Sequence, residues 1–219
     1  MLFPNRAEAG RTLAQRLHSY ANVPNLIVLG IPRGGVPVAF EVAAALKAPL
    51  DVLILRKLGV PYRQELAFGA IASGGIRYVD REIVEAAGIP DAELERIVAE
   101  QARELERRER AYRGGRPRLD VRGKTVVLVD DGIATGAGMR AAITALRKMG
   151  PARLVLAVPV APASACKHLA PLVDELVCAY MPESFYAIGE FYEDFAQLSD
   201  EEVTSFLRPP VTSSARNLT

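Results

Sequence analysis

Five apolar runs of strand length constrain the fold of this 219-residue chain more than any other feature of its sequence. The runs are nearly unbroken, which is typical of strands buried on both faces, whereas a half-exposed strand alternates apolar with polar residues. They lie at 26–30, 51–57, 125–131, 153–160 and 174–180. Helical patterns separate most of them. The sequence therefore predicts an α/β fold in three layers, a mainly parallel sheet with helices on both faces.

Helix signals support this alternation. Asn5, followed three residues later by Glu8, is a variant of the capping box and predicts that a helix starts there. Val38, Val42 and Leu46 recur at helical spacing and predict a second helix with one apolar face. We expect both helices to cover the predicted sheet.

The segment from 58 to 118 interrupts the alternation. Residues 69–80 (GAIASGGIRYVD) predict a hairpin or mobile flap, and residues from about 91 to 112 predict a highly charged helix. This helix carries an apolar stripe of Leu94, Ile97, Val98, Gln101 and Leu105. The stripe either packs on its own domain or forms a dimerisation arm, which would make the protein a homodimer. We favour the first interpretation because so short a stripe rarely sustains a coiled coil.

The domain organisation follows from these patterns. We expect a single domain over residues 1–208, completed by a hood-like segment at about 181–208. Residues 209–219 have no periodicity and predict a disordered tail.

Charge and cysteine content limit the partners and the compartment. The net charge of +1 gives no electrostatic case for nucleic acid, and no apolar run is long enough to span a membrane. Cys166 and Cys178 lack the CxxC spacing, which favours a reduced, buried pair. Because a signal-peptide pattern is also missing, we expect a cytoplasmic location.

Residues 126–138 read VVLVDDGIATGAG and place two acids at the mouth of a small-residue loop. Since ligands of a parallel sheet bind at the carboxyl ends of its strands, Asp130 and Asp131 would emerge at the binding edge, and Gly132 eases a turn there. Residues 134–138 then open a helix, whose free N–H groups and positive dipole end attract phosphate. Carboxylates accept hydrogen bonds from a vicinal diol, so a sugar phosphate satisfies both halves of the stretch.

Other phosphate motifs fit this stretch less well. A Walker loop requires a lysine after its last glycine, and a dinucleotide fingerprint has no acids at this point. Phosphatases of the haloacid dehalogenase type separate their two aspartates by one residue. An ordinary strand–turn–helix corner with solvated acids remains the structural alternative.

The stretch resembles the phosphoribosyl-pyrophosphate (PRPP) motif of type I phosphoribosyltransferases. The resemblance implies that Asp130 and Asp131 hold the ribose 2- and 3-hydroxyls. The remaining motif residues would bind PRPP, the last five around its 5-phosphate: Gly132, Ile133, Ala134, Thr135, Gly136, Ala137 and Gly138. The motif departs from the family at Gly138, because the family usually has Ser or Thr at the matching position. It also departs at Ala134, where hypoxanthine-guanine enzymes carry an aspartate but adenine and uracil enzymes also carry Ala.

A second match, PRGG at 32–35, follows the first predicted strand. It resembles the pyrophosphate loop of the same family, in which Arg33 and the backbone N–H groups of Gly34 and Gly35 bind an anion. Relatives have a non-proline cis peptide here, which implies a cis bond between Pro32 and Arg33. A glycine turn at a helix start is the alternative for this short motif.

Two further matches are weaker. Arg56 and Lys57 end the predicted second strand, where the family places a lysine that reaches the pyrophosphate. Residues 182–195 resemble the segment of hypoxanthine-guanine enzymes in which an aromatic ring stacks on the base, so Phe185 or Tyr186 would contact the acceptor. A solvated basic pair and a small hydrophobic cluster are the respective alternatives.

The resemblance implies transfer of the 5-phosphoribosyl group from Mg-PRPP to a nucleobase-like acceptor, with release of pyrophosphate. Asp130, Asp131, Arg33 and Lys57 would carry catalysis, and Mg²⁺ would bind mainly through PRPP because no protein-only ligand cluster is present. A flap at 67–80 would close to exclude water. The alternatives are a non-catalytic PRPP-binding regulator of the same fold and a phosphoribohydrolase-like or salvage enzyme for a non-base acceptor. The sequence does not identify the acceptor.

Overall fold

The computed structural model describes residues 2–117 and 119–208. Its centre is a five-stranded sheet in the order β2-β1-β6-β7-β8, and every neighbouring pair in it is parallel. This confirms the predicted α/β fold. The strands are β1 (Leu26–Gly30), β2 (Leu50–Val52), β6 (Thr125–Val129), β7 (Arg153–Val160) and β8 (Glu175–Tyr180).

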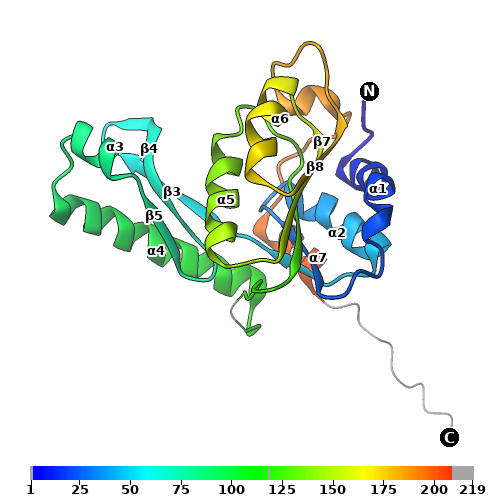
Figure 1. Cartoon of the computed structure of the whole chain (residues 1–219), viewed down its shortest axis with the longest axis horizontal. Helices are drawn as coiled ribbons and strands as arrows, with labels where there is room; N and C mark the ends of the chain where they lie inside the picture. The colour runs from blue at the N-terminus through cyan, green and yellow to red at the C-terminus, as the bar shows by residue number, and fades with distance from the viewer. Residues whose placement is uncertain (1, 118, 209–219) are drawn as a thin grey trace, which may run out of the picture.

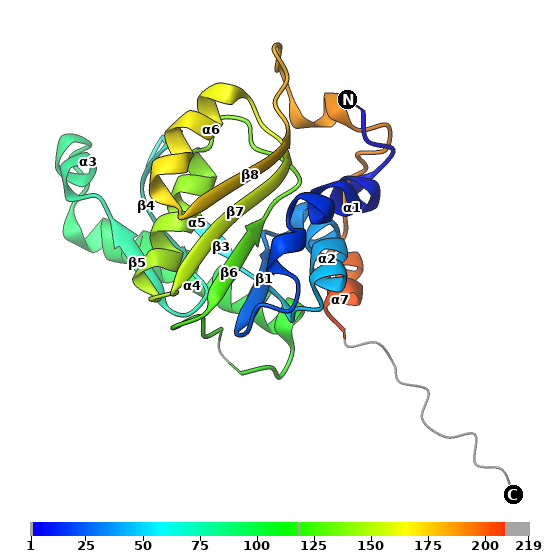
Figure 2. The same ribbon diagram turned by 45° about the vertical axis from the view of Figure 1, so that its right-hand side comes forward.

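Helices cover both faces of this sheet, because successive residues of a buried strand point to opposite sides. Val28, Val127 and Val155 pack against α1 and α2, whereas their neighbours Val126 and Leu154 pack against α5 and α6. Figure 2 shows β1, β6, β7 and β8 between these two helix layers. The helices are α1 (Arg6–Arg16), α2 (Gly35–Leu46), α5 (Ala137–Lys148) and α6 (Ala163–Leu169). The helix start predicted from Asn5 is confirmed, and so is the second helix predicted from the stripe of Val38, Val42 and Leu46.

The predicted strand at 51–57 is wrong, because the chain changes sheets within it. β2 ends at Val52, and β3 (Leu55–Val60) joins β4 (Arg63–Ala72) and β5 (Ile76–Val79) in a separate antiparallel sheet. Buried Ser73 stabilises the change: its hydroxyl accepts from the N–H of Ile54, and its own N–H donates to the Ile54 carbonyl. The apolar run hides this switch, since residues 52–54 are buried throughout.

The hairpin predicted at 69–80 is present as β4 and β5, and Figure 1 shows its sheet beyond α5, outside the main sheet. It is followed by α3 (Arg81–Ala86) and the predicted charged helix, α4 (Asp91–Arg113). The stripe of α4 packs into a core that includes Phe68 of β4. This packing supports the interpretation that α4 packs on its own domain, and the homodimer stays a prediction.

The end of α4 is anchored to the main sheet. Arg113 donates to both carboxylate oxygens of Asp51 at 2.9 Å, and both side chains are buried. Arg113 also donates to the carbonyl of Pro117 at 2.6 Å. The inserted segment is therefore tied to β2 at the point where the chain returns to the central sheet.

The C-terminal part contains a helix that the sequence patterns did not indicate. α7 (Asp200–Leu207) starts in a capping box formed by Ser199 and Glu202 and contacts α2 and α4. Before it, η3 (Ile188–Phe191) and Tyr192 pack on or beside Phe3. These residues belong to the segment predicted as a hood, and that role stays a prediction. Two further short helices are η1 (His18–Tyr20) and η2 (Ala170–Leu172). The predicted tail at 209–219 lies outside the described residues.

Two smaller predictions concern cysteines and membranes. Cys166 and Cys178 are free thiols; Cys166 is buried in the main core, as predicted, whereas Cys178 is only half-buried and packs against it. Among the described residues, no helix combines the length and the apolar character that crossing a bilayer requires.

Candidate functional site

The acid motif and the PRGG loop follow adjacent strands. Gly30 at the end of β1 pairs with Val129 at the end of β6, and the N–H of Ile31 donates to the Val129 carbonyl at 2.9 Å. Asp130 comes directly after Val129. The two predicted loops therefore leave the same edge of the sheet side by side.

Glycines allow these loops to touch. A Cβ atom at Gly34 would lie 1.8 Å from Oδ2 of Asp131, and one at Gly35 would lie 2.8 Å from the Cα of Asp130. Neither glycine has a positive φ angle, so the requirement is space and not backbone conformation. The structure thus brings the predicted diol-binding acids and the predicted pyrophosphate loop into one site.

Arg6 holds the second acid. Its Nε donates to Asp131 Oδ2 at 2.9 Å, and the two side chains are only 11% and 12% exposed. The Arg6 Nη1 atom donates to the carbonyl of Ala196 at 2.9 Å, and the guanidinium lies 3.9 Å from the centre of the Phe195 ring. The Tyr192 hydroxyl donates to the backbone carbonyl of Asp131 at 2.6 Å. Sequence reasoning missed Arg6, which belongs to no motif.

Burial dominates the electrostatics of the acids. Desolvation and the charge of Asp131 raise the pKa of Asp130 well above its ordinary value. Desolvation also raises the pKa of Asp131, although the hydrogen bond and charge of Arg6 oppose the shift. Desolvation, with the charge of Asp131, raises the pKa of the Tyr192 hydroxyl. A ligand that donates hydrogen bonds to the acids would replace the water that they have lost.

The loop at residues 134–138, predicted to bind phosphate and called the phosphate loop below, is open at its tip. Ile133 is buried and donates its N–H to the Val160 carbonyl at 3.0 Å, whereas Ala134 and Thr135 are exposed. Gly136, with φ of 80°, ends the loop, and α5 begins at Ala137. Within the described residues, no backbone carbonyl accepts from the N–H groups of 134–138. They are free to bind an anion, as the motif predicts.

The prediction about Gly132 needs a correction. Its φ angle is not positive, so it does not supply an unusual turn. A Cβ atom there would lie 2.6 Å from Cγ2 of Ile188 in η3. Glycine at this position makes room for the hood.

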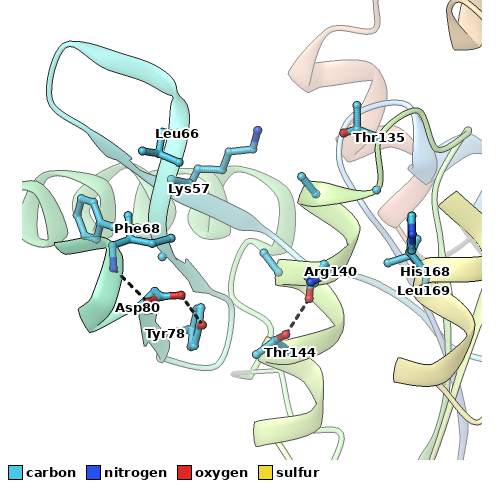
Figure 3. A pocket seen from close by; sticks show the side chains of 16 residues that line it. Lys57, Leu66, Phe68, Tyr78, Asp80, Thr135, Arg140, Thr144, His168 and Leu169 are labelled. Atoms are coloured by element: carbon cyan, nitrogen blue, oxygen red, sulfur yellow. Dashed lines mark hydrogen bonds between the residues drawn. The ribbon is translucent and has the colours of Figure 1, made fainter. Parts of the chain in front are cut away.

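A cavity of about 510 Å³ adjoins the phosphate loop. One wall comes from β3, β4, β5 and α3, and the other from Thr135, α5 and the end of α6. Figure 3 shows the Lys57 side chain extending from β3 toward the end of the cavity where Thr135 lies. Lys57 is exposed and forms no ion pair with the residues that the structure describes. It is therefore placed to meet a ligand anchored in the loop.

Arg56 does not join the other predicted site residues. Neighbours on a strand point to opposite sides, and Arg56 donates to Gln101 Oε1 of α4 at 2.9 and 2.7 Å. It contacts the inserted helix, whereas Lys57 lines the cavity. The prediction that both basic residues bind PRPP is thus supported for Lys57 only.

Arg33 points toward the C-terminal helix. The peptide bond between Pro32 and Arg33 is cis, as the resemblance implied. Nη1 of Arg33 lies 3.9 Å from Oδ1 of Asp200, and the side chain is 38% exposed. The same oxygen accepts from the Tyr112 hydroxyl at 2.5 Å, and burial together with Asp200 raises the pKa of Tyr112 to about 12. Asp200 thus connects α4, α7 and the predicted pyrophosphate loop.

Comparison with known proteins agrees with this geometry. The phosphoribosyl transferase domain matches residues 3–193, which include both loops and the whole central sheet. The chain belongs to the phosphoribosyl transferase domain family.

Relatives within the family vary in length. A Mycobacterium tuberculosis protein (strain H37Rv), provisionally named a phosphoribosyl transferase, is 48% identical over 206 residues, or 94% of this chain and 46% of the relative. The chain spans about half the length of the curated relatives from this organism. Bifunctional protein PyrR of Roseiflexus sp. (strain RS-1) is 32% identical over 145 residues, covering 63% of this chain and 57% of PyrR. The crystal structure of TT1426 from Thermus thermophilus matches with a TM-score of 0.83 at 41% identity, over 94% of this chain and 98% of that one.

The predicted acceptor residues lie in the hood of this phosphoribosyl transferase domain. Phe185 stacks on Phe191 with ring centres 5.4 Å apart, within a small aromatic cluster. Tyr186 is 85% exposed. Phe185 thus has a structural partner already, and the contact of either residue with an acceptor stays a prediction.

Proposed function

We propose that this chain transfers the 5-phosphoribosyl group from Mg-PRPP to a nucleobase-like acceptor and releases pyrophosphate. One observation carries the proposal: the backbone of Gly34 lies against the carboxylate of Asp131. This contact joins a loop suited to pyrophosphate with acids suited to a ribose diol. Membership of the phosphoribosyl transferase domain family supports it.

The proposed roles follow from the chemistry of each group. Asp130 and Asp131 accept hydrogen bonds from the ribose 2- and 3-hydroxyls, and their negative charge favours the positive charge that develops at C1. The free N–H groups of residues 134–138 bind the 5-phosphate. With these three anchors, the sugar would lie across the carboxyl edge of β6.

The departing pyrophosphate requires positive charge. We assign this role to Arg33 and Lys57, together with the N–H groups of Gly34 and Gly35. The described residues contain no group of three or more His, Cys, Asp or Glu side chains suited to a metal ion. Mg²⁺ would therefore arrive on the oxygens of PRPP, where it neutralises charge on the leaving group. Arg33 would leave its long-range contact with Asp200 to reach the pyrophosphate.

Water must be excluded while the sugar reacts, because hydrolysis of PRPP competes with transfer. The hairpin at 67–80 forms part of one wall of the cavity next to the phosphate loop, so we assign it the closing role. The acceptor would enter from the hood side, near Phe185 and Tyr186. Hypoxanthine-guanine enzymes use a lysine for the 6-oxo group, and residues 158–163 contain none, so purine specificity is not part of the proposal.

The test is a screen of nucleobases and other nitrogen acceptors for PRPP-dependent release of pyrophosphate. With a productive acceptor, Arg33→Ala should lower turnover by on the order of a hundredfold while weakening PRPP binding much less, because the arginine acts on charge developed in the transition state. A wild-type protein that releases no pyrophosphate but binds nucleic acid in a PRPP-dependent way would instead be a regulator.

A further inference from the structure

Arg6 lies outside every motif of the site. Among the described residues, it alone forms an ion pair with Asp130 or Asp131. It is the first residue of α1, and 125 positions separate it from Asp131. Its guanidinium has three partners: the Asp131 carboxylate, the Ala196 carbonyl and the face of the Phe195 ring. These partners come from the acid motif and from the C-terminal segment that follows η3. The position of the guanidinium is therefore fixed from two sides.

The ion pair occupies only one oxygen of Asp131. Oδ2 accepts from Arg6 Nε and is the oxygen nearer to Gly34, where a Cβ atom would lie 1.8 Å from Oδ2 and 3.1 Å from Oδ1. Among the described residues, Arg6 is the one that donates an N–H group to this carboxylate, and the Asp130 carboxyl lies beside it. Asp131 is 8% exposed, so the carboxylate has little freedom to turn. Arg6 and Gly34 together leave Oδ1 as the atom that can accept from a ligand.

We propose that Arg6 is a positioning residue for the ribose diol: by fixing Oδ2 of Asp131, it presents Oδ1 to a ribose hydroxyl. This inference rests on the proposed function and adds a residue to it. Arg6 itself touches no part of the sugar in this role. Its effect on the ligand passes through the orientation and charge of Asp131.

The charges around the acids agree with this role. The titratable and charged groups that face Asp131 are Asp130 beside it, Arg6 from α1 and the Tyr192 hydroxyl from the hood. Arg6 is the only cation among these three. Without it, the buried Asp131 carboxylate and its half-buried neighbour Asp130 would repel each other and take up protons, and a protonated acid no longer accepts in the same way. Buried ion pairs add little to stability compared with apolar packing, so stability alone does not account for the arginine.

A pair of sugar phosphates tests the inference. Ribose 5-phosphate and 2-deoxyribose 5-phosphate share the phosphate but differ in the 2-hydroxyl, so the ratio of their affinities measures the hydroxyl contact. We expect wild type to prefer ribose 5-phosphate by on the order of tenfold or more, as for a hydrogen bond to a charged group. Arg6→Met should remove most of this preference and change the affinity for 2-deoxyribose 5-phosphate by less than about threefold. Arg6→Lys should retain part of the preference.

Arg11→Met is the matched control. Arg11 lies on the same helix and pairs with Glu8 and Glu41. Its side chain is 55% exposed and, among the described residues, forms no ion pair with Asp130 or Asp131. Its removal should leave the preference unchanged. Calorimetry measures the affinities. The pH dependence of ribose 5-phosphate binding gives a second readout, because only the ionised Asp131 accepts the hydrogen bond. As the pH falls, Arg6→Met should lose binding at a higher pH than wild type does, because the pKa of Asp131 rises when its cation is removed.

The outcomes are distinct. If Arg6→Met keeps the wild-type preference and pH profile, the positioning role is overturned while the proposed function stands. If Arg6→Met does not fold, Arg6→Lys decides, and an undiminished preference in it overturns the role. If wild type binds neither sugar phosphate nor PRPP, the proposed function fails and the role of Arg6 falls with it.

Discussion

Gly34 lies so close to Asp131 that a Cβ atom on the glycine would fall 1.8 Å from the carboxylate oxygen Oδ2. Two loops that lie far apart in the sequence therefore share one packed surface. The position of the carboxylate depends on the backbone of the PRGG loop as much as on its own strand. Ligand binding should thus respond to changes at specific atoms of either loop.

Gly34→Ala should displace the Asp131 carboxylate and lower PRPP affinity by on the order of a hundredfold, since the carboxylate loses its orientation in a buried site. Gly34 has α-helical dihedral angles, φ −63° and ψ −32°, so alanine causes no backbone strain there. Gly59→Ala is the control, because a Cβ atom at Gly59 has no neighbour within 4 Å. Calorimetry checks both variants, and equal PRPP affinity in Gly34→Ala and wild type would contradict the packing argument.

Asp130→Asn should stabilise the ligand-free protein at neutral pH while it removes PRPP binding. Burial raises the pKa of Asp130 in the folded state, so folding favours the protonated acid. The stability that the protonated Asp130 contributes is therefore fully present below the pKa of the unfolded state, about 3.9. It is lost as the pH rises through the higher pKa of the folded state. The Tm of Asp130→Asn minus that of wild type should thus grow as pH increases from about 4 to about 8. A difference that does not change with pH would show that Asp130 is not desolvated.

Lys57→Ala should lower turnover by on the order of a hundredfold, because the ammonium faces the phosphate loop across the cavity. Arg56→Ala offers a matched comparison at the neighbouring residue. Its hydrogen bonds go to Gln101, so it should lower Tm and leave turnover within a few-fold of wild type. Steady-state kinetics with a productive acceptor measures turnover in both variants. If Arg56→Ala lowers turnover more than Lys57→Ala does, the role assigned to Lys57 is wrong.

Gly138→Ser should tighten PRPP binding by several-fold, since a serine hydroxyl adds one donor beside the 5-phosphate. The site has room for the side chain: a Cβ atom at Gly138 meets nothing within 4 Å. The residue lies in the first turn of α5, where serine is well tolerated. Titration with PRPP and with inorganic phosphate measures the effect, and weaker binding of both ligands would place the phosphate elsewhere.

The parts of the site that the sequence predicted are those encoded by neighbours in the chain. Residues 126–138 form a strand, two acids and a helix start in direct succession, and the register of β1 with β6 brings the PRGG loop beside them. Arg6 could not be found in this way, because its contact with Asp131 spans 125 positions and its helix pattern is that of any amphipathic helix. The change of sheets at Leu53 and Ile54 was also hidden, since residues 52–54 are apolar and buried and so continue the pattern of β2 without a break.

The pairing of Gly30 with Val129 limits which insertions and deletions the site can tolerate. A slip of one residue between β1 and β6 would move one loop past the other by about 3.3 Å, more than a hydrogen bond can stretch. Asp131 and Gly34 would then no longer meet, and the carboxylate would lose the close contact that the missing Cβ atom of Gly34 allows. An insertion or deletion of a single residue inside either strand should therefore abolish ligand binding even where the sheet still forms, whereas the loops that connect the opposite ends of these strands are free to vary in length.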